Sequence, residues 1–184
     1  MNVFEILASL EDDVDLHLGR LLVLLSVFSG KQGKYEINGL TKLVKLDFLL
    51  RYPIYLERAL EKVNVSPNDA RVMKHERMSV ESSMIRFHYG PWDPRHRFFL
   101  NLLIAKGLVR VSISGRTINI GVTPAGFEKG NKLSHDDNFM DVAYRALLLK
   151  RHFDMGGTRL KNFIYETFPE IASLNLGEEI TYEF

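Results

Sequence analysis

RFFLNLLIAKGLVRVSISGRTINIGVTP, residues 97–124, carries the clearest structural pattern in this sequence. Its first part, residues 97–106, has apolar side chains at helical spacing, and Gly107 follows where a helix commonly ends. Residues 108–113 and 117–122 each alternate apolar and polar side chains, and residues 114–116, Ser-Gly-Arg, separate them. The pattern predicts a helix followed by a β-hairpin with a basic tip.

The residues around this segment predict a mostly helical chain. Thr123-Pro124 has the order that favours a helix start, with threonine as the cap and proline at the first position. Residues 67–81 are polar and weakly periodic, so they are interpreted as a linker or an exposed helix. Apolar residues at helical spacing predict further helices over residues 13–28, 37–50, 54–63, 138–153 and 159–168.

The expected fold is therefore mainly α with a small β-hairpin: a winged helix-turn-helix core with flanking N- and C-terminal helices. We expect one domain over residues 1–184, a length that can bury a core without disulfides. Within it, residues 15–63 supply N-terminal helices and residues 84–133 supply the helix and the wing hairpin. Residues 137–184 supply C-terminal helices and an acidic tail, which is expected to be extended from residue 172 onward.

The formal net charge is only +1, but the charges are unevenly placed. Residues 1–15 hold five acidic side chains, residues 166–184 hold five more, and neither end has a Lys or Arg. All 24 basic side chains lie between the two ends. A basic body favours contact with nucleic acid. The alternative is that the acidic ends fold back on the body or bind a basic partner.

The sequence shows no recognisable catalytic chemistry. It lacks cysteine, which excludes disulfides, thiolate metal sites and cysteine nucleophiles. It also lacks an HExxH run, a glycine-rich phosphate loop and a GxSxG motif. His135-Asp136-Asp137 is the nearest approach to a metal-ligand cluster, and a polar loop explains it more simply. We therefore expect a protein that is not an enzyme and that needs no metal or cofactor.

Two features point to a cytoplasmic protein without a membrane span. Residues 1–15 lack the basic start of a signal peptide. The longest apolar stretch, residues 21–28, is too short to cross a bilayer.

Five basic residues near the hairpin are candidate nucleic-acid contacts. Arg116 lies at the hairpin tip, where a wing can touch a phosphate backbone. Apolar residues crowd the preceding helix, which argues against base-specific reading and favours non-specific backbone contact. An ordinary solvated face is the alternative. The candidates are Arg95, Arg97, Lys106, Arg110 and Arg116.

Aromatic residues supply candidate contacts to a protein partner. Tyr89 and Trp92 either pack the wing against its helix or form an exposed anchor, for which Trp and Tyr are favoured. Phe163 and Tyr165 fall near one face of the predicted helix 159–168. That helix either packs on the core or docks a partner.

Several runs of this sequence resemble the middle component of bacterial ABC-three-component systems, from about residue 15 to the C-terminus. The runs are LTKLVKLDFLLRYP (40–53), MIRFHYGPWDPRHRFFLNLLIAKGLV (84–109), VTPAGFEKGNKL (122–133) and LKRHFDMGGTRLKNFIYETFPEI (149–171).

The resemblance implies an adaptor that links an ABC-type ATPase to an effector protein in an anti-phage or anti-plasmid conflict system. It implies no catalytic residues. A more distant similarity, to winged-helix subunits of bacterial condensin-like ATPases, implies that a homodimer could form. The alternative function is a stand-alone winged-helix transcription regulator that binds DNA.

Overall fold

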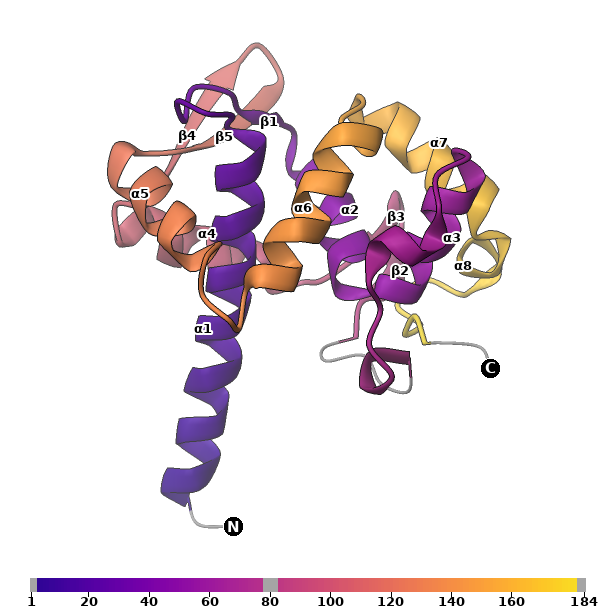
Figure 1. Ribbon diagram of the computed structural model, residues 1–184, viewed down its shortest axis with the longest axis horizontal. Coiled ribbons are helices and arrows are strands. Elements are labelled where there is room, and N and C mark those ends of the chain that lie inside the picture. Colours follow the sequence, from indigo (N-terminus) through magenta and orange to yellow (C-terminus); the bar gives the residue numbers. More distant parts are fainter. Residues whose placement is uncertain (1–2, 78–82, 182–184) are drawn as a thin grey trace.

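Helices make up most of the chain, as the sequence predicts, and the strands form two small antiparallel sheets, one more than the single predicted hairpin. The computed structural model describes residues 3–77 and 83–181, with the side chains of the first helix described from Val14 onward. Figure 1 shows the elements, which are α1 (Val3–Phe28), β1 (Ile37–Asn38), α2 (Leu40–Arg51), α3 (Pro53–Lys62), the 3-10 turns Pro67–Ala70 and His75–Arg77, β2 (Ile85–Phe87), β3 (Gly90–Trp92), α4 (His96–Ala105), β4 (Val109–Ser114), β5 (Thr117–Val122), α5 (Pro124–Leu133), α6 (Met140–Phe153), α7 (Gly157–Thr167) and α8 (Pro169–Ser173).

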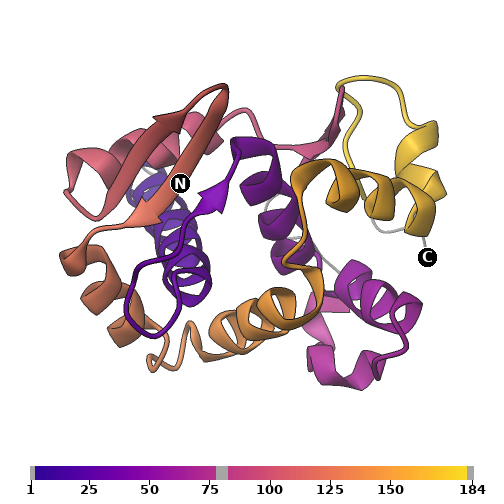
Figure 2. The same cartoon turned by 90° about the horizontal axis from the view of Figure 1, so that it is seen from above.

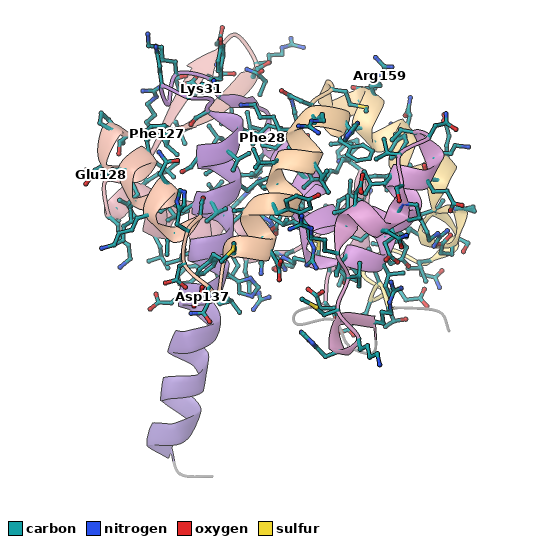
Figure 3. All side chains as sticks on the ribbon, in the orientation of Figure 1. Phe28, Lys31, Phe127, Glu128, Asp137 and Arg159 are labelled. Carbon is teal, nitrogen blue, oxygen red and sulfur yellow. The ribbon has the colours of Figure 1, made fainter. Side chains whose placement is uncertain are left out.

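The core forms where α1 packs against α5 and α6, and where α2 packs against α6 and α7. Seen from above, α2 lies between the three-stranded sheet with α1 on one side and α7 with α8 on the other (Figure 2). Leu24, Leu46 and Leu149 are completely buried there, one from each of α1, α2 and α6. Phe28 at the end of α1 lies toward α6, whereas Arg159 lies at the periphery (Figure 3).

Helix α1 is longer than its sequence pattern predicts. It begins at Val3 rather than near residue 13, and its first turns extend away from the rest of the chain (Figure 1). Asp13 and Asp15 are good caps, but a cap preference is local, and the residues before them also favour a helix. No helix in residues 3–77 or 83–181, α1 included, is long and apolar enough to cross a membrane.

The three-stranded sheet has the order β1-β5-β4, and both pairs are antiparallel. Ile120 of β5 lies between Ile37 of β1 and Val111 of β4. The prediction of one helix over residues 37–50 is therefore wrong at its start, because residues 37–38 are a strand. Gly39, with φ of 98°, separates that strand from α2, and its N–H donates to the Ile118 carbonyl at 2.7 Å. Only glycine adopts this backbone conformation without strain.

Turn and cap residues place the hairpin as predicted. Gly107 follows α4 with φ of +69°, which confirms its expected left-handed conformation. The Thr123 hydroxyl accepts a hydrogen bond from the Gly126 N–H at 3.0 Å, and Pro124 is the first residue of α5. Gly126 also lies against the backbone, since a Cβ added there would come within 1.8 Å of the Leu108 carbonyl oxygen. Helix α5 can pack this closely only because that residue has no side chain.

The C-terminal tail lies along β2, beside the short β2–β3 hairpin. After α8 the chain makes a turn, in which the Glu178 N–H donates to the Asn175 carbonyl at 3.1 Å, and Glu179 then forms an isolated antiparallel bridge with Ile85. The Arg86 N–H donates to the Glu178 carbonyl at 2.8 Å. The Ile180 N–H donates to the Met84 carbonyl, also at 2.8 Å. The Tyr52 hydroxyl ties both segments to the core, because it donates to the Ile180 carbonyl and accepts from the Met84 N–H. The expectation of an extended tail from residue 172 is therefore wrong at its start, because α8 continues to Ser173 and a turn follows it; strand-like pairing is confined to the single bridge at Glu179.

Candidate binding surface

A buried carboxylate joins three helices beneath the predicted basic residues. Asp47 of α2 is completely buried. Its Oδ1 accepts from Arg20 Nε of α1 at 2.8 Å, and its Oδ2 accepts from Arg51 Nε at 2.7 Å. His96 Nε2, at the start of α4, lies 3.0 Å from the same Oδ2. Burial alone would raise the pKa of Asp47, but the two guanidinium groups and His96 hold it well below its ordinary value.

The network continues through Asp93 to the surface at Arg95. Arg51 Nη1 donates to Asp93 Oδ2 at 2.6 Å, and Arg95 donates to both carboxylate oxygens from Nε and Nη2. Burial opposes ionisation of Asp93, but the hydrogen bonds from Arg95 and the charge of Arg51 lower its pKa. Arg95 is therefore committed to a structural ion pair that positions the start of α4. The sequence signal for this network was Asp47, the single acidic residue of a helix whose other charged residues are basic.

The structure divides the five candidate nucleic-acid residues into separate groups. Arg95 belongs to the buried network, and Arg110 Nε donates to Glu36 Oε1 at 3.1 Å. Arg97, Lys106 and Arg116 are exposed, and none of the three forms an ion pair with a residue that the structure describes. Only Arg97 and Arg116 line the same cavity, because Lys106 lies at the other end of α4.

Exposed apolar side chains are frequent on α4 and on the β4–β5 hairpin. Val109 and Val122 are buried at the base of the hairpin, where they pair. Farther along the same face, Ile113 and Ile118 pair with each other and are 76% and 41% exposed. Exposed apolar groups of this kind mark interaction sites when they gather. We call the set the hairpin surface: Phe98, Ile104, Val111, Ile113 and Ile118.

A cavity of about 530 Å³ lies between the tip of the β4–β5 hairpin, the β2–β3 hairpin and the first residues of α2 and α7. We call it the interhairpin cavity. Trp92 and Phe87 form one wall, with stacked rings whose centroids are 6.1 Å apart. Tyr89, which is 61% exposed, also lines it. The structure thus brings the two predicted aromatic residues Tyr89 and Trp92 together with the predicted basic residues Arg97 and Arg116.

Lys45 is a further lining residue that the sequence did not single out. The side chain is only 2% exposed, and its Nζ donates to the Thr41 carbonyl at 3.3 Å. No carboxylate among the described residues pairs with it. Burial, followed by the nearby charge of Lys161, lowers the pKa of Lys45 to about 8. One hydrogen bond to a carbonyl offsets only part of the free-energy cost of burying the charged ammonium group.

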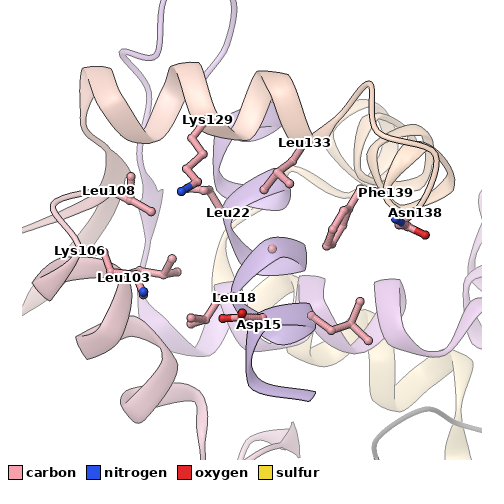
Figure 4. A pocket seen from close by; sticks show the side chains of 12 residues that line it. Asp15, Leu18, Leu22, Leu103, Lys106, Leu108, Lys129, Leu133, Asn138 and Phe139 are labelled. Carbon is pink, nitrogen blue, oxygen red and sulfur yellow. The ribbon is translucent and has the colours of Figure 1, made fainter. Parts of the chain in front are cut away.

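A second cavity, of about 720 Å³, lies between α1, α4 and α5. Leu18, Leu22 and Leu103 contribute to its mainly apolar wall (Figure 4). Lys106 and Lys129 lie on one side of it. This is where the structure places Lys106, away from Arg97 and Arg116.

The other predicted partner-binding residues, Phe163 and Tyr165, are half-buried and pack against the core. The Phe163 ring lies 5.4 Å from that of Phe153. Helix α7 therefore packs on the core, which is the first of the two readings of its sequence. Within the described part of the chain, no group of three or more His, Asp or Glu side chains could hold a metal ion.

Comparison with known proteins gives no match to a family model, to a curated protein or to a solved structure. Functional inference for this chain therefore rests on the surface described above and on its sequence.

Proposed function

We propose that this chain is a non-catalytic adaptor with a winged-helix core, which binds a protein partner through the hairpin surface. The order α1-β1-α2-α4-β4-β5, with the strands arranged β1-β5-β4, supports such a core. In this reading α4 is the recognition helix and the β4–β5 hairpin is the wing. Residues 52–95, which include α3 and the β2–β3 hairpin, are an insertion between the second and third core helices.

The observation that carries the proposal is the apolar character of the hairpin surface. A recognition helix that reads DNA presents polar and basic side chains to base edges. Here α4 presents Phe98 and Ile104, which are 52% and 41% exposed. Ile113 at the end of the wing is 76% exposed. Covering such side chains with a partner removes apolar area from water, which favours protein association.

The resemblance in the sequence supports the identity of the partners. They are an ABC-type ATPase and an effector protein of a conflict system in the bacterial cytoplasm, with the chain acting singly or as a homodimer. The adaptor then transmits the state of the ATPase to the effector and needs no chemistry of its own.

The test is capture of the ATPase by a tagged chain from its native host, after nuclease treatment. The double variant Phe98→Ser with Ile113→Ser is expected to lose the ATPase, whereas the wild type retains it. Leu147→Ser is the matched control, since Leu147 is an aliphatic residue of α6 that is 56% exposed. Equal capture by the wild type and the double variant contradicts the proposal for this surface.

A stand-alone transcription regulator is the second candidate. Arg97 and Arg116 favour it, because both guanidinium groups are exposed and neither pairs with a carboxylate in the described part of the chain. This function requires a duplex sequence that is bound about a thousandfold more tightly than unrelated DNA. Binding that depends on salt and not on sequence eliminates it.

A further inference from the structure

Lys45 and its neighbour Lys42 are both buried but differ in the groups that they contact. Both side chains are buried on α2, with exposed fractions of 2% and 7%. Lys42 Nζ donates to the Asp154 carboxylate at 2.6 Å. Among the residues that the structure describes, Lys45 Nζ donates only to the Thr41 carbonyl, at 3.3 Å, although an ammonium group can donate three hydrogen bonds. Buried charges in folded proteins are normally paired. Because Lys45 lines the interhairpin cavity, a negatively charged group bound in that cavity could pair with it.

Two helix starts add backbone donors to the same cavity. The first residues of α2, Leu40 and Thr41, line it, as do the first residues of α7, Gly157 and Thr158. The first N–H groups of a helix have no intrahelical acceptor, and neither α2 nor α7 has a side-chain cap. Helix N-termini favour anions. The two helix starts and Lys45 therefore supply the cavity lining with hydrogen-bond donors and with positive potential.

The cavity rim combines cations with flat aromatic rings. Arg97 and Arg116 line it from α4 and from the turn of the β4–β5 hairpin. The same cavity is lined by Trp92, which is stacked on Phe87 with an interplanar angle of 30°, and by Tyr89, which is largely exposed. Such rings stack on nucleobases. The volume of about 530 Å³ lies within the range typical of small-molecule sites, about 300–1,000 Å³.

We propose that the interhairpin cavity binds a nucleoside phosphate, with the phosphate beside Lys45 and the helix starts and the base against Trp92. A phosphate carries more charge than a carboxylate and offers three acceptor oxygens, which suits several converging donors. The ligand is either a free nucleotide or the phosphorylated end of a nucleic-acid strand. This inference does not rest on the adaptor proposal, because it concerns a small ligand held by Lys45, the two helix starts and Trp92.

Trp92 is the only tryptophan in the chain, so its fluorescence reports directly on the cavity wall. Titration of the intact protein with adenosine monophosphate is expected to change this fluorescence saturably. Adenosine, which has no phosphate, is expected to bind about tenfold more weakly or worse, because it cannot accept the charge-assisted hydrogen bonds from the cavity. Inorganic phosphate is expected to compete with the nucleotide.

Lys45→Gln keeps most of the side-chain volume and removes the charge. It is expected to weaken nucleotide binding about tenfold or more in calorimetry, which does not depend on tryptophan. Lys129→Gln is the matched control, because Lys129 lines the other cavity, and it is expected to bind as the wild type does. Circular dichroism establishes that both variants are folded. Equal affinity of folded Lys45→Gln and wild type overturns the proposal.

The source of the phosphate is decided by a second comparison. Tighter binding of adenosine monophosphate than of a 5′-phosphorylated single-stranded oligonucleotide supports a free nucleotide. The reverse order, with loss of binding when the 5′ phosphate is removed, supports a strand end. Binding of neither probe at millimolar concentration overturns the proposal, and so does saturable binding of an acidic peptide alone.

Discussion

Asp47→Asn tests whether the buried charge network holds the helices together. The substitution preserves side-chain volume but removes the charge that faces Arg20 and Arg51, whose Nε atoms lie 2.8 and 2.7 Å from the carboxylate. Removing one partner of a buried ion pair costs about 3–5 kcal/mol, because the remaining charge stays buried without compensation. Stability changes of this size lower the melting temperature of a chain of this length by about 2–4 °C per kcal/mol. We therefore expect Asp47→Asn to melt roughly 6–20 °C below the wild type.

Thermal and urea unfolding followed by circular dichroism measures this difference. Glu36→Gln is the control, because both side chains of its pair with Arg110 are partly exposed, 24% for Glu36 and 46% for Arg110, and we expect it to cost less than about 1 kcal/mol. The folded-state pKa of Asp47 is depressed, so its stabilisation is present above the unfolded value, about 3.9, and is lost as pH falls through the folded value. The gap between wild type and variant should therefore close only in strong acid. An Asp47→Asn protein within about 1 kcal/mol of the wild type near pH 7 would refute this reasoning.

The remaining predictions concern two glycines, one lysine and one arginine. Gly107→Ala should cost about 1 kcal/mol in urea unfolding, since φ is +69° and the space is open. Gly126→Ala should lower the free energy of unfolding more than Gly107→Ala does, because its Cβ would meet the Leu108 carbonyl oxygen. Equal losses of stability in the two variants would contradict the close packing of α5 on Leu108. Lys45→Met should raise stability near pH 7 by up to ~3 kcal/mol. In the wild type, the free energy of unfolding is expected to rise between pH 8 and 10.5, because the Lys45 amine is protonated in the unfolded chain but not in the folded one. In Lys45→Met this rise is expected to be absent. If the chain binds DNA, Arg116→Ala should reduce the slope of log affinity against log salt by about one, and an unchanged slope would show that Arg116 makes no phosphate contact.

Local chemistry made the hairpin region predictable. The alternation of residues 108–113 and 117–122, the Ser-Gly-Arg turn and the Thr123-Pro124 start all act within a few residues. The observed bounds of β4, β5 and α5 accordingly agree closely with the pattern. The strand at residues 37–38 could not be found in this way. It is two residues long and exists because β5, far away in the sequence, pairs with it.

The sequence found parts of the candidate site but not their arrangement. Arg97, Arg116, Tyr89 and Trp92 were each selected for their side-chain chemistry, and the fold places all four around one cavity. Lys45 was not among the five candidates, because a lysine in a helix is ordinarily part of a solvated face. Its burial depends on the β2–β3 hairpin, where the position of a Cβ on Gly90 would lie 3.6 Å from Lys45 Cε. Such tertiary burial leaves no trace in local periodicity.

The two proposals meet at one residue, Ile118, and this makes their relation testable. Ile118 lines the interhairpin cavity and also belongs to the hairpin surface, where it is 41% exposed. A nucleotide in the cavity and a protein over the hairpin would therefore share contact area, and each would weaken the binding of the other by the same factor. We expect adenosine monophosphate to reduce capture of the partner by the wild type, and we expect the concentration needed for the same reduction to be higher for Lys45→Gln. Capture that is independent of nucleotide in both proteins would show that the partner leaves Ile118 and the cavity mouth uncovered.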